Sequence, residues 1–193
     1  MSATFQPAGV DPDDDAMIRL AAGDDHALDE LMDRWSSGVI GFLMRLTGNH
    51  ATACDLAQEA FVRLYQSRER YRPGGTFKAF LFQISANLAR NHARWRNRHP
   101  ETSMDRDEFP EPAGPEHSNP SSEAVAGEAT RAVKEAVLAL PEDFRTPLVL
   151  SVYEGHGHKE IASMLGCSAK AVEMRIYKAR QILRGELQEF LAG

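Results

Sequence analysis

A break in composition over residues 100–126 limits the chain to folds that have two separate cores. This stretch holds five prolines and seven acidic residues, with Arg106 as its one base and few large apolar side chains. Such a segment cannot bury enough apolar surface to offset the entropy lost on folding. We therefore expect a flexible acidic linker here, with a relaxed span of about 30 Å and an extended limit of about 90 Å.

The block before this break has the apolar repeat of amphipathic helices. Apolar residues recur at steps of three and four, which places them on one helix face. The first such stripe consists of Leu28, Leu31, Trp35, Val39, Phe42 and Leu46. Gly48 should end this helix, and further helices are expected over residues 52–70 and, with Thr76 as its cap, over 77–99. A short helix is expected over residues 16–22 with Asp15 as its cap. Residues 16–99 should thus form a helical bundle behind an acidic tail of residues 1–15.

The block after the break, residues 127–193, also opens with helical patterns. One apolar helix face runs from Ala129 to Leu140 and ends at Pro141. Thr146 followed by Pro147 resembles a cap and first-turn pair, because proline lacks only an amide that the first turn leaves unbonded. A second helix is therefore expected from Pro147 to the residue before Gly155.

Residues 159–180 contain two shorter helical patterns joined by a tight turn. Gly166 can adopt the left-handed conformation of that turn, and Ser168 can cap the second helix. This spacing is typical of a helix-turn-helix, in which the second helix enters the major groove of DNA. The predicted fold is all-α, with an N-terminal helical bundle and a C-terminal helix-turn-helix domain as two small domains joined by the linker.

Positive charge is concentrated in two helices although the chain carries a net charge of −6. Residues 88–99 hold four arginines and no acid, and residues 169–184 hold five bases against Glu173 alone. Attraction to phosphate is screened within about 10 Å, so two separate basic helices suit a protein that binds nucleic acid at two points. Two solvated amphipathic helices would carry the same charges, so charge alone does not decide between these interpretations.

The residue types on each basic helix add to the nucleic-acid interpretation. On the second helix of the helix-turn-helix, Lys and Arg can bond guanine or phosphate, and Glu can accept from cytosine. On the helix over residues 77–99, Asn87, Arg90, Asn91 and Arg94 can share one polar face. Aromatic residues near such a face can stack on unpaired bases. The neighbouring rings of Phe77, Phe80 and Trp95 are nevertheless each expected in the core.

Four segments in this order make the chain resemble a sigma factor of the extracytoplasmic-function type, the minimal promoter-recognition subunit of bacterial RNA polymerase. The segments are DLAQEAFVRLY at residues 55–65, FLFQISANLARNHARWR at 80–96, LPEDFR at 140–145 and the helix-turn-helix. The resemblance covers about residues 16–99 and 127–190. It departs from the family pattern at Phe80, Asn91 and Gly157, where tryptophan, aspartate and serine are frequent.

The resemblance implies three sets of site residues. Docking on the clamp helices of the polymerase is implied for Asp55, Gln58, Glu59 and Phe61. Opening and reading of the −10 promoter element is implied for Asn87, Arg90, Asn91, Arg94, Arg96 and Arg98. Reading of the −35 element is implied for Ser168, Lys170, Glu173, Met174, Arg175 and Lys178. The expected partners are core RNA polymerase, promoter DNA and, as is common in the family, an anti-sigma factor.

Two other classes of protein are alternatives to a sigma factor. A free-standing DNA-binding repressor or activator would need no polymerase, and the segment from Asp55 to Phe61 would then be only core and surface. An enzyme acting on nucleic acid would need a phosphate loop, a nucleophile elbow or clustered metal ligands, none of which is found. We therefore expect no catalytic residue, no metal and no cofactor.

The remaining sequence signals concern metal sites and location. His156 and His158 lack further ligands nearby, and Cys54 and Cys167 make neither a disulfide framework nor a zinc set. No run of about 18 apolar residues and no secretory signal are found. A cytoplasmic protein without membrane insertion is expected.

Overall fold

The computed structural model describes residues 11–74, 76–99 and 120–188, and every regular element in these ranges is helical. The helices are α1 (Pro12–Ala21), α2 (His26–Thr47), α3 (His50–Gln66), η1 (Arg68–Arg70), α4 (Phe77–Arg98), α5 (Pro120–Ala139), α6 (Glu142–Val152), α7 (His158–Leu165) and α8 (Ala169–Glu186). The predicted all-α fold class is confirmed. Most of the predicted linker, and residues 1–10, lie outside the described residues, whereas residues 120–126 belong to α5.

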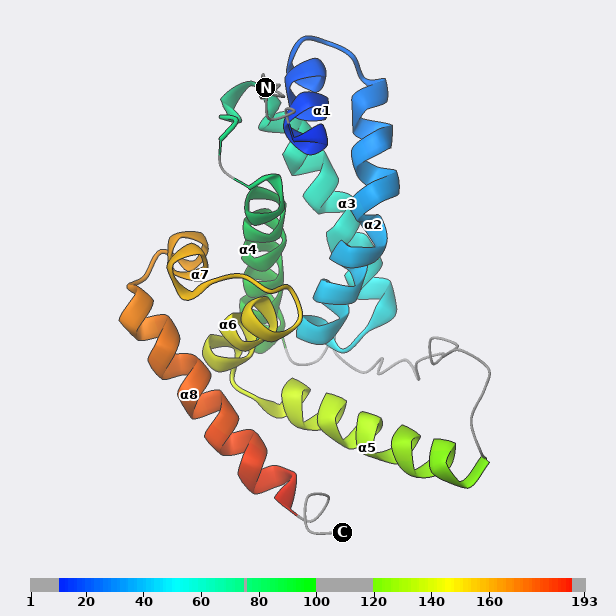
Figure 1. The fold of residues 1–193 in the computed structure, drawn as a ribbon, viewed down its shortest axis with the longest axis vertical. Helices are drawn as coiled ribbons and strands as arrows, with labels where there is room; N and C mark the ends of the chain where they lie inside the picture. Colours follow the sequence, from blue (N-terminus) through cyan, green and yellow to red (C-terminus); the bar gives the residue numbers. More distant parts are fainter. Residues whose placement is uncertain (1–10, 75, 100–119, 189–193) are drawn as a thin grey trace, which may run out of the picture.

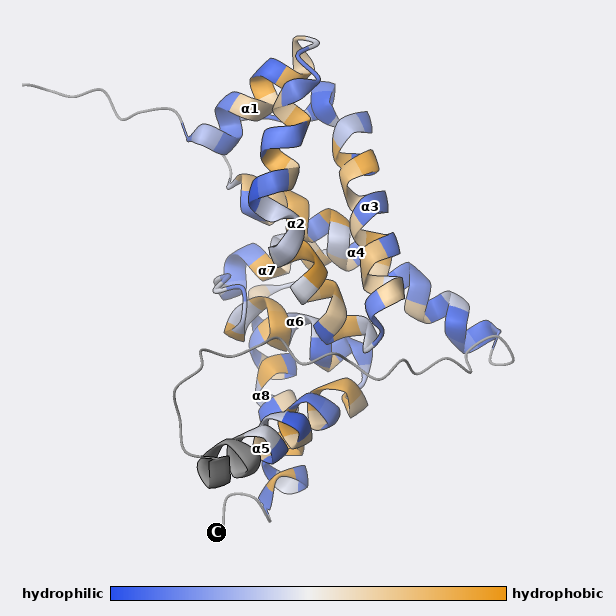
Figure 2. Ribbon diagram, turned by 90° about the vertical axis from the view of Figure 1, so that its right-hand side faces the viewer, coloured by the Kyte–Doolittle hydropathy of each residue, from blue (hydrophilic) through white to orange (hydrophobic). Residues whose placement is uncertain are grey.

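Helices α1 to α4 form a bundle in which α2 packs along both α3 and α4 (Figure 1). The rings of Phe42 and Phe82 meet edge to face in its centre, with centroids 5.0 Å apart. Leu64 of α3 and Leu81 of α4 are fully buried beside them. Figure 2 shows hydrophobic and hydrophilic residues alternating along these helices, as the sequence periodicity predicts.

Helix α1 begins earlier than predicted, so the acidic segment before residue 16 is not a loose tail over residues 12–15. The cap is Asp11, whose side chain accepts a hydrogen bond from the backbone N–H of Asp13 at 2.8 Å, and Pro12 occupies the first helical position. The predicted cap, Asp15, lies inside the helix. Met17 and Leu20 are fully buried, and they bind α1 to the bundle.

Two of the acidic residues of α1 hold it in place by contacts far away in the sequence. The carboxylate of Asp13 accepts hydrogen bonds from Arg34 and, at 3.1 Å, from Nε1 of Trp35. The carboxylate of Asp14 accepts one from the hydroxyl of Tyr71. The two acids are 7% and 8% exposed, respectively. Sequence periodicity could not find these partners, because they lie on other elements.

Several predicted helix boundaries are confirmed. Gly48 ends α2 with φ of 74°, a left-handed conformation that glycine adopts without steric cost. The hydroxyl of Thr76 caps α4 by accepting from the N–H of Ala79 at 3.3 Å. The helix predicted over residues 52–70 is instead α3 followed by η1, which begins at Arg68.

Helix α6 begins at Glu142 and contains Pro147, so the predicted cap and first-turn pair is wrong. Pro141 is the residue at the cap position, and Thr146 is a buried residue within the helix. A proline at the sixth helical position removes one backbone hydrogen bond. The buried Leu148, Val149 and Leu150 that follow show that packing keeps the helix intact across this gap.

The C-terminal helices lie against the N-terminal bundle. Helices α6 and α7 contact α4, α6 also contacts α2, and α5 contacts α2 (Figure 1). Helix α8 lies on the far side of α6 and α7 from α4. Among the described helices, none is both long and apolar enough to cross a membrane.

Candidate nucleic-acid and polymerase interfaces

Helices α7 and α8 form the predicted helix-turn-helix. Gly166 between them has φ of 64°, and its left-handed conformation reverses the chain within one turn. The hydroxyl of Ser168 caps α8 by accepting from the N–H of Ala171 at 3.1 Å. Val172 and Ile176 of α8 are buried, which fixes the rotation of this helix. The opposite face of α8 is therefore turned to solvent.

The outward face of α8 carries most of the predicted −35 residues. Exposed side chains on it are Lys170, Glu173, Met174, Tyr177 and Lys178. Nζ of Lys170 lies 3.0 Å from Oε2 of Glu173, and this exposed ion pair contributes little to stability. Lys170 and Glu173 can therefore each give up this ion pair and contact DNA instead. The predicted Ser168 also lies at the start of this face, where its hydroxyl is already engaged by the cap.

Two residues on α8, one inside and one outside the predicted −35 set, have distinctive surroundings. Arg175 is half-buried, and its Nη1 donates to Sγ of Cys167 at 3.8 Å, so it starts from a fixed position at the edge of the face. Tyr177 was absent from the predicted −35 set, yet 57% of it is exposed. Its hydroxyl accepts from Nε2 of Gln181 at 2.6 Å. An aromatic ring on the outward side of a recognition helix was the signal that could have found it.

Helix α4 presents four of the predicted −10 residues as one stripe. At 100° per residue, Asn87, Asn91, Arg94 and Arg98 fall within a narrow arc. Asn91, Arg94 and Arg98 are exposed, and Asn87 is half-buried. Asn87 borders a groove between α3 and α4 that Glu59, Arg63, Gln66, Ser67 and Ile84 also line.

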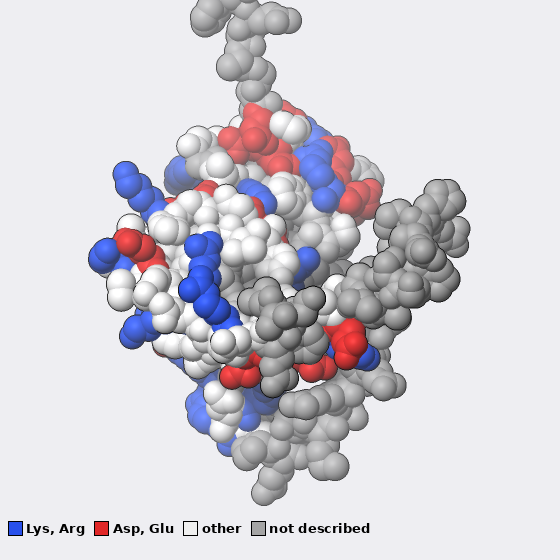
Figure 3. Space-filling view, turned by 60° about the horizontal axis from the view of Figure 1, so that its bottom comes forward, with Lys and Arg blue, Asp and Glu red and all other residues white. Residues whose placement is uncertain are grey.

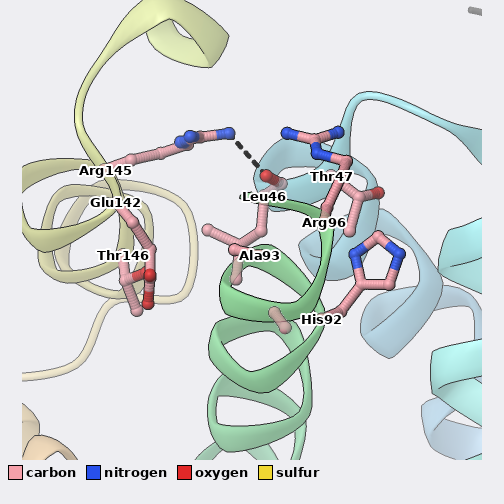
Figure 4. Close-up of a pocket in the computed structure, with 9 residues that line it drawn as sticks. Leu46, Thr47, His92, Ala93, Arg96, Glu142, Arg145 and Thr146 are labelled. Atoms are coloured by element: carbon pink, nitrogen blue, oxygen red, sulfur yellow. Dashed lines mark hydrogen bonds between the residues drawn. The ribbon is translucent and has the colours of Figure 1, made fainter. Parts of the chain in front are cut away.

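The other two predicted −10 residues lie in different surroundings. Nε of Arg90 lies 3.3 Å from Oε1 of Glu142 on α6. Arg96 points from the far side of α4 into a small cavity where it faces Arg145 (Figure 4). Nη1 of Arg145 donates to the carbonyl of Leu46 at 2.6 Å, near the C-terminal end of α2. The structure therefore does not bring all six residues onto one surface.

The electrostatics of this cavity follow from the number of cations around it. Burial, with Arg96 nearby, lowers the pKa of Arg145, and Glu142 acts in the opposite direction. Burial, again with Arg96 nearby, lowers the pKa of His92. The lowered pKa favours the neutral form of the His92 ring.

Trp95 was predicted in the core, but 45% of it is exposed. Its ring stacks on that of His99 with centroids 4.9 Å apart, and the centroid of the His92 ring lies 6.4 Å from it. The apolar stripe of α4 extends beyond the body of the bundle, so the last member of the stripe has no core to enter. Trp95 lies one helical turn from Asn91, beside the stripe of polar and basic residues.

The predicted polymerase-docking residues divide between the surface and the core. Asp55, Gln58 and Glu59 are exposed on α3, and Nε of Arg63 donates to Oε1 of Glu59 at 2.7 Å. Phe61 is only 3% exposed, so it packs in the bundle and cannot contact a partner. Val62 is 49% exposed and, by helical spacing, lies on the face of Asp55 and Glu59. Counting the helix repeat outward from the buried stripe would have selected it.

The surface charge is unevenly distributed. In Figure 3, Lys and Arg side chains predominate along the left and lower parts of the visible face, and Asp and Glu are most concentrated at its upper end. Within the ranges that the structure covers, no group of three or more His, Cys, Asp or Glu side chains could hold a metal ion. The outward chemistry of α4 and α8 is thus that of cations, amides and aromatic rings.

Two family descriptions match the chain. "Sigma-70 region 2" matches residues 31–99, which hold α3 and α4, and "Sigma-70, region 4" matches residues 130–183, which hold the helix-turn-helix. The two matched segments contain all three sets of predicted site residues.

Similar proteins and structures agree with these matches. RNA polymerase sigma-H factor of Pseudomonas aeruginosa is 30% identical, over 93% of this chain and 95% of its own length. RNA polymerase sigma factor CarQ of Myxococcus xanthus is 35% identical, over 89% of this chain and 97% of its own.

Two solved structures share the fold. CnrH, solved with the cytosolic domain of CnrY, covers 93% of this chain and 99% of its own with a TM-score of 0.67 at 23% identity. RpoE of Bartonella quintana, solved with the anti-sigma factor NepR, covers 83% of this chain and 96% of its own with a TM-score of 0.67 at 21% identity. The chain belongs to the extracytoplasmic-function family of bacterial RNA polymerase sigma factors.

Proposed function

We propose that this chain binds core RNA polymerase and directs initiation at promoters that carry two elements, a −10 element opened by α4 and a −35 element read by α8. The observation that carries the proposal is the outward face of α8, which a glycine turn, a serine cap and two buried residues hold in the orientation of a recognition helix. The family membership supplies the polymerase as the partner.

The α8 face can both hold and read duplex DNA. Lys170 and Lys178 are exposed cations that can neutralise phosphates, whereas the planar guanidinium of the half-buried Arg175 can bond guanine through two parallel hydrogen bonds. Glu173 can accept from cytosine once Lys170 turns to a phosphate. Met174 and Tyr177 offer apolar contact to thymine methyl groups.

The α4 stripe is suited to strands that are no longer paired. Asn87 and Asn91 can bond the exposed edges of bases, and Arg94 and Arg98 can neutralise the backbone beside them. Trp95 provides a ring on which an unstacked base can lie. Extrusion of a base costs a few kcal/mol, and stacking of this kind offsets part of that cost.

The exposed face of α3 is the surface that we assign to the polymerase. Asp55, Gln58 and Glu59 supply polar contacts. Val62 supplies the apolar contact, because Phe61 is buried and cannot reach a partner. The groove between Glu59 and Asn87 joins this surface to the −10 stripe. Polymerase binding would thus fix α4 relative to the DNA.

The remaining parts of the proposal follow from the family. The chain acts as a cytoplasmic initiation factor without a catalytic residue or cofactor of its own, and the polymerase performs the chemistry. The structures of CnrH with CnrY and of RpoE with NepR support an anti-sigma factor as a further partner.

Run-off transcription with bacterial core polymerase across a random promoter library tests the function. We expect transcripts from templates that share one −10 and one −35 sequence. Asp55→Lys should abolish them, whereas Glu69→Lys, the same charge change on the exposed side of η1, should not. A purified chain that fails to bind core polymerase would overturn the proposal and favour a free-standing DNA-binding regulator.

A further inference from the structure

Two neighbouring acids hold helix α1 between two parts of the bundle. Successive residues of an α-helix point about 100° apart, so Asp13 and Asp14 face different partners. Asp13 bonds to Arg34 and Trp35 of α2. Asp14 faces the loop of residues 67–74, which follows α3. Helix α1 therefore links α2 to this loop.

The carboxylate of Asp14 joins two points of the loop. Its Oδ1 accepts a hydrogen bond from the hydroxyl of Tyr71, and its Oδ2 accepts one from the backbone N–H of Gly74 at 3.3 Å. Gly74 has φ of 102°, a conformation that glycine adopts without steric cost. The buried carboxylate needs such donors, because an unpaired charge away from water is costly. The two bonds together hold the loop against α1.

The ring of Tyr71 connects the loop to the start of α4. It meets the ring of Phe77 edge to face with centroids 6.3 Å apart, and the centroid of the Phe80 ring lies 5.3 Å from it. Burial, together with the bond to Asp14, raises the pKa of Tyr71, so its hydroxyl stays protonated and donates at neutral pH. The position of the loop thus depends on a hydrogen bond and on ring contacts that are removed from water.

The loop and the end of α3 present one unengaged cation. Of the four bases between residues 63 and 72, three are bound to neighbouring protein groups. Arg63 forms an ion pair on α3, Arg68 stacks on an aromatic ring, and Arg72 donates to two backbone carbonyls of the loop. Arg70 is exposed, and within the described part of the chain its side chain has no hydrogen-bond or ion-pair partner. Its charge is therefore available to a ligand.

Arg70 lies near the groove between α3 and α4. Ser67, which lines the groove, immediately precedes η1, and Arg70 is the last residue of η1. At about 2.0 Å per residue of a 3₁₀-helix, Arg70 is about 6 Å further along the axis, which a long arginine side chain can span. The groove measures about 390 Å³, and Asn87 of the α4 stripe also lines it. A strand bound at Asn87 is thus within reach of Arg70.

We propose that Arg70 is a further promoter contact, which binds a backbone phosphate of the opened −10 strand, and that Asp14 is a positioning residue that holds Arg70 beside the groove. The proposal rests on the proposed function, because it adds a contact to the strand that α4 binds. A guanidinium can form two parallel hydrogen bonds with a phosphate, and a loop that is already fixed loses less entropy when they form. Neither residue belongs to the predicted −10 set.

Salt dependence measures the phosphate contact of Arg70. Each phosphate neutralised on a single strand contributes about 0.7 to the magnitude of the slope of log K against log salt, compared with about 0.9 on duplex DNA. The probe is a fluorescein-labelled single strand that carries the −10 sequence selected by the transcription library, and its anisotropy reports binding to the holoenzyme. For Arg70→Gln we expect the magnitude of the slope to fall by about 0.7. Arg131→Gln, the same change at an exposed position of α5, should keep the slope.

A double-mutant cycle tests the positioning by Asp14. Asp14→Asn leaves one acceptor oxygen for two donors, so either Tyr71 or Gly74 loses its partner. We expect this variant to weaken strand binding about fivefold when Arg70 is present and not at all in combination with Arg70→Gln. Tyr71→Phe keeps the ring packing and should behave in the same way. Asp15→Asn removes the same charge from an exposed neighbour and is the control.

Hydrogen exchange follows the loop in the free chain without polymerase. The N–H of Gly74 should exchange about tenfold faster in Asp14→Asn than in the wild type, because its acceptor is weakened. Asp15→Asn should leave this rate unaltered. Equal rates in all three proteins would overturn the contact between Asp14 and the loop.

The outcomes separate this proposal from the proposed function. A wild-type salt slope in Arg70→Gln, with the strand still bound, would overturn the phosphate contact alone. Equal losses from Asp14→Asn with and without Arg70 would give Asp14 a purely structural role and overturn the positioning. A wild-type holoenzyme that binds no selected strand would overturn the proposed function and the phosphate contact together, whereas the exchange rate of Gly74 would still decide the contact with Asp14.

Discussion

Salt dependence distinguishes a phosphate contact from a base contact on α8. Lys178 is exposed and has no ion-pair partner among the described residues. For Lys178→Ala we predict weaker binding to all promoter variants, with the slope of log K against log salt reduced by about one, because one fewer counterion is released. Filter binding of the polymerase holoenzyme between low and moderate salt measures it. Arg131→Ala on α5, also exposed, is the control and should keep the slope; an unchanged slope for Lys178→Ala would remove Lys178 from the contacts.

Trp95 is predicted to stabilise the opened −10 strand. Stacking of one base on an aromatic ring contributes about 1–3 kcal/mol, so Trp95→Ala should lower open-complex stability by about five- to a hundredfold. Trp95→Phe keeps a ring and should recover part of this loss. Permanganate reactivity of unpaired thymines measures the opening. Equal opening by the alanine variant and the wild type would return Trp95 to a structural role.

The pKa of Glu160 is predicted to depend on Thr76. Burial alone would raise this pKa, but hydrogen bonds from Thr76 and His156 outweigh burial and lower it. The stability that this ionised carboxylate contributes through its hydrogen bonds is complete above the ordinary pKa of 4.5 and is lost as pH falls through the lowered value. In Thr76→Val, NMR titration of the Glu160 carboxyl carbon should give a higher pKa. Thr47→Val, whose hydroxyl bonds the carbonyl of Leu43, is the control.

The anchoring of helix α1 to the bundle is predicted to depend on Asp13 and not on Asp15. Asp13→Ala leaves Nε1 of Trp35 without its acceptor in a partly buried site, so we expect a loss of about 1–3 kcal/mol in the free energy of unfolding. Asp15→Ala removes only an exposed ion pair with Arg19 and should change stability little. Urea denaturation followed by circular dichroism compares them. Equal midpoints for both variants would contradict the anchoring role of Asp13.

At the scale of helices, the sequence predicted some caps and turns correctly and missed others. Local chemistry predicted the cap at Thr76, the cap at Ser168 and the turn at Gly166, because each depends only on residues within one helical turn. The start of α1 at Asp11 and Pro12 rests on the same local chemistry and was missed. The proline within α6 was missed because packing of the buried residues that follow it keeps the helix intact.

The residues of the candidate site likewise divide into those whose placement helical spacing predicted and those whose placement it did not predict. The outward face of α8 follows from helical spacing and was predicted. On α4, the predicted polar face is retained for Asn87, Asn91 and Arg94, whereas Arg90 pairs with Glu142. The burial of Phe61 also follows from helical spacing, because it lies on the same face as the buried Ala57, Ala60 and Leu64. The exposure of Trp95 depends on where the bundle ends, which periodicity within one helix cannot show. The pairing of Arg90 with Glu142 joins residues on either side of the predicted linker, and no local pattern contains it.

The N-terminal and C-terminal regions should separate as the salt concentration rises. The contact between the two regions combines the ion pairs of Lys78 with Glu154 and of Arg90 with Glu142 with apolar packing of Leu138 near Gly48 and of His156 on Phe82. The Debye length falls from about 10 Å at 0.1 M to about 3 Å at 1 M, so the partly exposed Arg90 pair weakens first. Small-angle X-ray scattering of the free chain should therefore show the radius of gyration increasing with sodium chloride.

A matched variant makes this measurement specific. Glu142→Arg should begin at the larger radius and change less with salt, because its main screened attraction is already lost. Glu186→Arg should follow the wild-type curve. A radius that stays constant in the wild type would mean that the apolar contacts of α5 and the cores around Phe82 hold the regions together.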